Sequence, residues 1–119
     1  MTVLLLMVAG AAGAVARFAG DAAIQRRGDG SYPWGTFCIN VSGCLLLGLI
    51  TGWYDHHGGR VLRDVAGTGF CGAFTTFSAF SIESIQLVEA RRYLTAARYI
   101  LTSLAAGGIA AAAGLALVR

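Results

Sequence analysis

The sequence predicts an all-α integral membrane protein with four transmembrane helices. The 119-residue chain is 56% hydrophobic and only 13% charged, and a water-soluble domain of that size would expose too much apolar surface. Charged residues are absent from four long stretches, residues 1–16, 30–54, 65–82 and 99–118. About 20 apolar residues cross a hydrocarbon core of roughly 30 Å as one helix. We therefore expect a single four-helix domain with approximate spans at residues 2–20, 33–54, 62–84 and 95–118.

The first predicted helix reaches its full length through the turn that carries Arg17. No Lys or Arg precedes its apolar run, whereas a cleaved signal peptide carries positive charge before that run. We therefore expect a retained membrane helix. Small residues three and four positions apart predict a face for close helix packing: Ala9, Gly10 and Gly13.

The second predicted helix starts at Pro33 and Trp34. Proline is tolerated at a helix start, where its missing N–H costs nothing, and tryptophan suits the membrane interface. Asn40 lies in the middle of this span, where lipid cannot supply hydrogen-bond partners. It therefore either cross-links helices or lines a polar path, and its chemistry alone does not decide between these roles. Further along, Gly48 and Gly52 form a GxxxG packing motif.

The third span is unusually rich in residues that disfavour a continuous helix. These are Gly67, Gly69, Gly72, Thr75, Thr76 and Ser78. A break near residues 72–76 is one prediction, and it would indicate an ion site because unwound backbone inside a membrane needs protein or an ion to satisfy its carbonyls. The alternative is a continuous helix whose hydroxyl groups bond back to their own backbone.

The residues after the hydroxyl cluster offer few other polar or aromatic candidates. Phe77 and Phe80 would ordinarily contact lipid or core, although the positive edge of a phenyl ring can also favour an anion. Glu83 is either functional or solvated at the interface. Tyr99 and Ser103 share one face of the fourth helix.

The remaining chemistry-bearing residues do not form an enzyme site. Three cysteines fall inside predicted spans without metal-ligand spacing and are predicted to be packing residues: Cys38, Cys44 and Cys71. The loop pair His56 and His57 is predicted to be a solvated turn, with a metal site as the lesser alternative. The chain has no nucleophile with a positioned base and no ligand cluster, so we do not expect an enzyme.

Charge is distributed almost evenly between the two predicted sides of the membrane. The first and third connections carry six arginines and the opposite side carries three, so the positive-inside rule weakly places both termini outside. This near balance is compatible with insertion in both orientations. The formal net charge of +3 favours contact with lipid headgroups over nucleic acid. No internal repeat is evident, so a two-fold arrangement would require a second chain.

Three segments give the sequence a specific resemblance: GAVARF at residues 13–18, PWGTFCINVSG at 33–43 and GFCGAFTTFSAFS at 69–81. Together they resemble the Fluc/CrcB family of fluoride channels. The resemblance implies a dual-topology antiparallel dimer that crosses at its broken third helices. It also implies two pores for passive export of fluoride from the cytoplasm across the cell membrane, and a structural sodium ion at the dimer centre. Whether the dimer contains one chain type or two stays open.

The same resemblance assigns roles to individual positions. The sodium ion would be held by the backbone carbonyls of Gly72 and Thr75. The rings of Phe77 and Phe80 and the amide of Asn40 would face fluoride in the pore. The implied hydroxyl lining consists of Ser78, Thr76, Ser103 and Tyr99. Glu83 matches an acid at the pore end, and Gly107 stands where some relatives have a hydroxyl group.

Two other functions compete with this interpretation. A small multidrug transporter has a similar length and helix count, but it needs a carboxylate in the middle of the first helix, and here no acid precedes Asp21. The second alternative is a membrane subunit that transports nothing and stabilises a partner.

Overall fold

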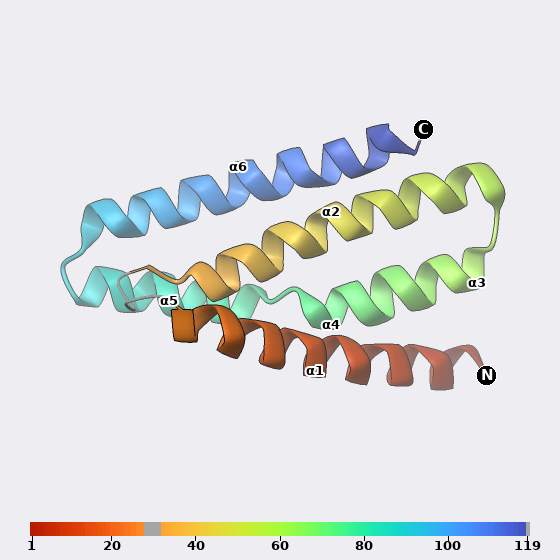
Figure 1. Cartoon of the computed structure of the whole chain (residues 1–119), viewed down its shortest axis with the longest axis horizontal. Coiled ribbons are helices and arrows are strands. Elements are labelled where there is room, and N and C mark those ends of the chain that lie inside the picture. Colours follow the sequence, from red (N-terminus) through yellow and green to blue (C-terminus); the bar gives the residue numbers. More distant parts are fainter. Residues whose placement is uncertain (28–31, 119) are drawn as a thin grey trace.

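A computed structural model describes residues 1–27 and 32–118, apart from the side chain of His56, so the histidine-pair prediction lies partly outside the described residues. The described residues form helices joined by short turns, without any strand in these ranges (Figure 1). In chain order these are α1 (Thr2–Arg27), α2 (Trp34–His57), α3 (Arg60–Arg63), the π-helix η1 (Asp64–Cys71), α4 (Gly72–Phe74), α5 (Phe77–Glu89) and α6 (Tyr93–Leu117).

The first two helices differ in how closely they follow the predicted spans. Helix α1 continues beyond residue 20 to Arg27, and the arginines in its last turn interact favourably with the helix dipole. Helix α2 starts directly after Pro33 and ends before Gly58. Gly58 has φ 79°, a backbone conformation that glycine adopts easily, and its amide donates to the Tyr54 carbonyl at 2.9 Å.

The third span is broken, which confirms the first of the two alternatives for this segment. Helical backbone runs without interruption from Arg60 to Phe74. Thr75 then adopts φ −77° and ψ 152°, and Thr76 adopts φ −143° and ψ 115°. Both conformations are extended, and α5 begins at Phe77. The π-helical turns before the break were not predicted from the sequence.

A tight turn at Arg91 separates α5 from α6. Arg91 has φ 61°, and its amide donates to the Val88 carbonyl at 3.0 Å. The next amide, of Arg92, donates to the Leu87 carbonyl at 2.9 Å. These bonds satisfy carbonyls at the end of α5 and let the chain reverse.

The four spans pack as an elongated bundle with extents of 48 × 29 × 22 Å. Helix α6 lies along α2, while α1 lies along η1 and α4 (Figure 1). A Cβ atom added at Gly48 would lie 2.2 Å from the Ala111 carbonyl oxygen, and one added at Gly13 would lie 2.2 Å from the Phe70 carbonyl oxygen. Only glycine permits these backbone approaches, so the predicted small-residue faces of the first two helices are helix contacts.

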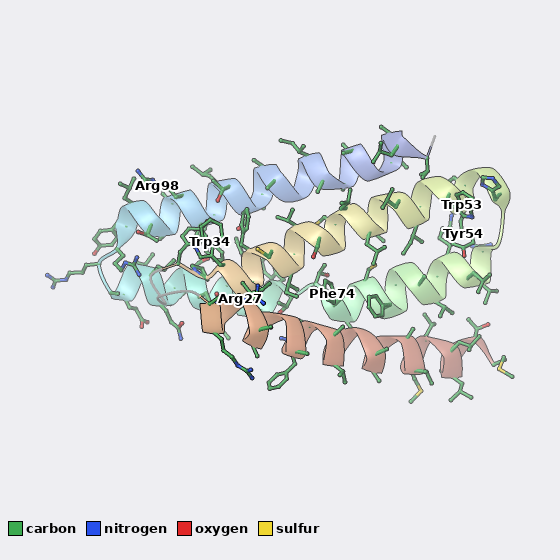
Figure 2. All side chains as sticks on the ribbon, viewed as in Figure 1. Arg27, Trp34, Trp53, Tyr54, Phe74 and Arg98 are labelled. Carbon is green, nitrogen blue, oxygen red and sulfur yellow. The ribbon has the colours of Figure 1, made fainter. Side chains whose placement is uncertain are left out.

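The exterior of the bundle is strongly apolar. Four helices are long and apolar enough to cross a membrane, namely Thr2–Arg27, Trp34–Asp55, Arg60–Glu89 and Tyr93–Leu117. Large hydrophobic side chains such as Phe18 and Ile109 are exposed, and Figure 2 shows side chains projecting outward along α1 and α6. The chain is therefore a multi-pass membrane protein. The start of α1 and the end of α6 lie at the same end of the bundle (Figure 1).

Candidate ion pathway

Asn40 binds the broken segment of the third span from the neighbouring helix. Its Oδ1 atom accepts a hydrogen bond from the Thr76 amide at 2.8 Å, and its Nδ2 atom donates to the Thr76 carbonyl at 3.1 Å. The pair of bonds fixes which end of the carboxamide is oxygen, because the amide N–H needs an acceptor and the carbonyl needs a donor. Among the described residues, one N–H of Asn40 Nδ2 remains available for another acceptor.

The break is also stabilised by a side-chain cap at the start of α5. Thr76 is the N-cap, and its Oγ1 atom accepts from the Ala79 amide at 3.2 Å. Ser78 Oγ lies 3.4 Å from the same Thr76 oxygen. The hydroxyl cluster predicted from the sequence thus lies at a helix N-terminus, which favours negative charge.

These bonds change the environment of two backbone carbonyls. In a continuous helix the amide of Thr76 would donate to the carbonyl of Gly72, but here it donates to Asn40. Similarly, the Ala79 amide would donate to the Thr75 carbonyl, but it donates to Thr76 Oγ1. The Gly72 and Thr75 carbonyls are therefore released from their helical donors, and a Cβ added at Gly72 would meet nothing within 4 Å.

A cavity of about 340 Å³ lies beside the break. Most of the candidate residues meet there, on α2, the broken segment, α5 and α6. Its lining consists of Asn40, Cys44, Leu47, Thr75, Thr76, Phe77, Phe80, Ser103, Leu104, Gly107 and Gly108. The wall is largely apolar and carries a few polar groups, as is usual for a small-ligand site.

The two phenylalanines occupy different environments in this cavity. Their ring centroids lie 6.1 Å apart at an interplanar angle of 34°. Phe77 is 79% exposed, whereas Phe80 is half-buried and packs against Tyr99 at a centroid distance of 5.1 Å. Ser103 contributes a buried Oγ atom without a hydrogen-bond partner among the described residues. Gly107 adds no donor at the next step of this face.

Tyr99 and Glu83 lie outside the cavity lining. Tyr99 is 0% exposed. Its ring packs against Phe80, which lines the cavity, and also makes a T-shaped contact with Tyr32 at a centroid distance of 5.5 Å. Glu83 Oε1 accepts a hydrogen bond from Thr36 Oγ1 at 2.5 Å. Sequence reasoning missed Thr36, which is 2% exposed. A hydroxyl one turn before Asn40 was the available signal, since positions i and i+4 share a helix face.

The other predicted groups lie apart from this region or have local partners. Cys71 is buried, Cys38 and Cys44 are half-buried, and all three are free thiols. His57 stacks on Trp53 at 4.1 Å, and its Nδ1 atom lies 2.9 Å from the Trp53 carbonyl. Within residues 1–27 and 32–118, no three His, Cys, Asp or Glu side chains gather in a way that could hold a metal ion.

Comparison with known proteins decides the family. The profile described as CrcB-like protein, Camphor Resistance (CrcB), matches residues 4–115. The chain belongs to the CrcB family. This membership confirms the resemblance found in the three sequence motifs, and it removes the small multidrug transporter as an alternative.

Curated members of the CrcB family resemble the chain along almost its whole length. Fluoride-specific ion channel FluC 1 of Streptomyces avermitilis is 47% identical over 113 residues, which cover 93% of this chain and 91% of the relative. Fluoride-specific ion channel FluC of Methylobacterium nodulans is 40% identical and covers 100% and 97%. Fluoride-specific ion channel FluC 2 of Cutibacterium acnes is 44% identical and covers 98% and 97%. These relatives are named as channels, and the CrcB family is accordingly one of ion channels and not of enzymes.

Proposed function

We propose that this protein is a fluoride-selective ion channel that exports fluoride passively from the cytoplasm across the cell membrane. The observation that carries the proposal is the cavity at the break in the third span, where an amide donor, hydroxyl groups and phenyl rings meet inside an apolar wall. The names of the CrcB relatives point to the same ion.

The chemistry of this cavity suits fluoride. Fluoride is small and strongly hydrated, so its water must be replaced by donors at close range. The second N–H of Asn40 and the unpartnered hydroxyl of Ser103 are such donors. Phe77 and Phe80 offer ring edges, which attract an anion without the full charge that would trap it. The chain contains no lysine.

The remaining candidate residues extend the route beyond the cavity. In this proposal Thr76 and Ser78 supply hydroxyl groups at the α5 N-terminus, where the helix dipole favours an anion. Tyr99 lies one helical turn before Ser103 on α6 and continues the route from it. Glu83 lies at the outer end of the route. The unpartnered Tyr99 hydroxyl supports its place in a pathway, because a buried polar atom needs a partner.

We further propose that two chains assemble as an antiparallel, dual-topology dimer with two pores. Phe77 is largely exposed although it stands at the centre of the broken span, which supports cover by another chain. The near balance of arginines between the two sides supports insertion in both orientations. Either two identical chains or two related chains fit this arrangement.

A structural sodium ion at the centre of that dimer is part of the proposal. Sodium prefers hard oxygen ligands, and the carbonyls of Gly72 and Thr75 are released from their helical donors at the break. The open space at Gly72 leaves room for a ligand or a second chain to approach. The residues present therefore fit the ion, which would supply the missing partner for these carbonyls.

Fluoride efflux from liposomes that contain only this protein tests the proposed function. We expect rapid fluoride release into a fluoride-free bath, with chloride retained in a parallel experiment. Fluoride release no faster than from empty liposomes would contradict the proposal and favour the alternative of a subunit that transports nothing. Equal release of both anions would contradict selectivity for fluoride.

A further inference from the structure

The thiol of Cys44 lies where α2 contacts α6, beside the cavity at the break. The two helices run side by side in the same direction (Figure 1). The Cys44 Sγ atom lies 3.4 Å from the position that a Cβ atom at Gly107 would take. Both residues line the cavity, so the Cys44 sulfur lies next to the gap that the glycine leaves in the cavity wall.

Cys44 and Gly107 lie one helical turn beyond Asn40 and Ser103. Residues four positions apart share a helix face, and all four of these residues line the cavity. At the first turn α2 offers the Asn40 amide, and α6 offers the Ser103 hydroxyl, which is buried without a partner among the described residues. At the second turn α6 offers no side chain. The Cys44 thiol is therefore the polar group that α2 places beside the gap.

We propose that Cys44 is a further residue of the fluoride pathway, whose S–H takes the place of the hydrogen-bond donor that Gly107 does not supply. This inference rests on the proposed function and extends its route by one helical turn. A thiol is a weak donor, and conduction needs sites that an ion can leave as well as enter. The cavity lining beyond Ser103 is otherwise apolar or glycine, with Leu47, Leu104, Gly107 and Gly108.

Fluoride efflux from liposomes, measured on matched variants, tests this role. Cys44→Ala removes the donor and should lower flux about three- to tenfold, the effect of losing one hydrogen bond at the limiting step. Cys44→Ser keeps a donor of similar size and should stay within about twofold of the unmodified protein. Cys38→Ala is the control, because Cys38 is also a half-buried free thiol on α2 but does not line this cavity.

Substitutions at Gly107 separate the donor role from packing. In the Cys44→Ala background, Gly107→Ser supplies a hydroxyl from α6 close to the place that the sulfur has left, and it should restore most of the lost flux. Gly107→Ala in the same background adds similar volume without a donor, so it should restore none. Gel filtration checks that each variant assembles as the unmodified protein does.

Methylmercury provides a test that does not remove a side chain. It replaces the thiol proton with an S–Hg bond, and the proton passes to the buffer. Bound at Cys44, the added group should occupy the pathway and block fluoride efflux, in the unmodified protein and in Cys38→Ala alike. Cys44→Ser should resist the block, because it has no thiol at this position. Excess dithiothreitol removes the metal and should restore efflux.

Three results would overturn the inference in a protein that conducts fluoride. The first is unchanged flux through Cys44→Ala. The second is equal recovery by Gly107→Ser and Gly107→Ala, which shows that volume and not a donor was lost. The third is a methylmercury block that persists in Cys44→Ser. Failure of the proposed function differs from all three, because the unmodified protein itself then releases fluoride no faster than empty liposomes do.

Discussion

Asn40 and Thr76 are joined by two hydrogen bonds, so that one side chain satisfies both the amide and the carbonyl of a residue in a broken helix. The carboxamide takes the place of the backbone partners that Thr76 would have in a regular helix. Asn40 therefore has a structural role at the break as well as a place in the cavity lining. The sequence left helix cross-linking and a polar path as alternatives; the two hydrogen bonds show the cross-link, and the polar path stays a prediction.

The first prediction concerns Asn40→Asp. The aspartate keeps an acceptor for the Thr76 amide but loses the donor to the Thr76 carbonyl, which should cost about 1–3 kcal/mol of stability. Its negative charge should also repel fluoride, so flux from liposomes should fall steeply while assembly persists. Ser42→Ala is the control on the same helix, because the Ser42 hydroxyl donates to the Cys38 and Ile39 carbonyls of its own helix. Undiminished flux through Asn40→Asp would show that Asn40 does not face the ion.

The second prediction concerns the phenyl ring of Phe80. Phe80→Ile keeps hydrophobicity and approximate volume but removes the ring edge, whereas Phe80→Tyr keeps the ring. A loss of about 1.4 kcal/mol at the limiting step would lower flux about tenfold. We therefore expect fluoride flux lost or strongly reduced in the isoleucine variant and at least partly kept in the tyrosine variant. Equal, substantial efflux from both variants would reject the ring-edge role, and the same pair at Phe77 tests that ring independently.

The third prediction concerns Thr75→Ala and the proposed sodium ion. The Thr75 hydroxyl donates to the Cys71 carbonyl at 2.9 Å, so its side chain is engaged within its own helix. If backbone carbonyls hold sodium, the variant should keep the stabilisation by sodium that we expect of the unmodified protein. Thermal unfolding in sodium and in N-methyl-glucamine buffers measures this difference. A variant that assembles normally but no longer responds to sodium would count against coordination by the backbone.

The fourth prediction compares two glycines on α1. A Cβ at Gly13 would lie 2.2 Å from the Phe70 carbonyl oxygen, whereas one at Gly10 would make an ordinary contact at 3.7 Å from the Gly69 oxygen. Gly13→Ala should therefore destabilise the bundle by about 1–3 kcal/mol through overpacking. Gly10→Ala should be neutral or stabilising by up to about 1 kcal/mol. Thermal unfolding in detergent decides the comparison, and equal stability of the two variants would refute the close contact at Gly13.

Local composition predicted the helical architecture and gave the break as one of two alternatives for the third span. The spacing of charged residues separated four spans, and the glycine and hydroxyl residues of the third span indicated where its helix fails. The pairing of Asn40 with Thr76 was not predictable, because it joins residues on different helices. The sequence identified Asn40 as a buried amide and Thr76 as a hydroxyl near a break, but it gave no relative placement of the two.

Asp21 shows why part of the polar chemistry escaped sequence reasoning. A charged residue after an apolar run is ordinarily taken as the end of a membrane span, and the predicted span stopped at residue 20. Helix α1 instead continues to Arg27, which places Asp21 inside the bundle and against Gly35. Thr36 escaped for a different reason, since a lone hydroxyl in a span usually bonds to its own helix.

The position of the two chain ends limits how two copies could be joined in one gene. The start of α1 and the end of α6 lie at the same end of the molecule. A short linker between two copies would therefore hold them in the same orientation across the bilayer. Fusion into an antiparallel pair requires a linker that itself crosses the membrane an odd number of times. A tandem fusion with one added transmembrane helix should conduct fluoride, and its counterpart with a short soluble linker should not do so within one polypeptide.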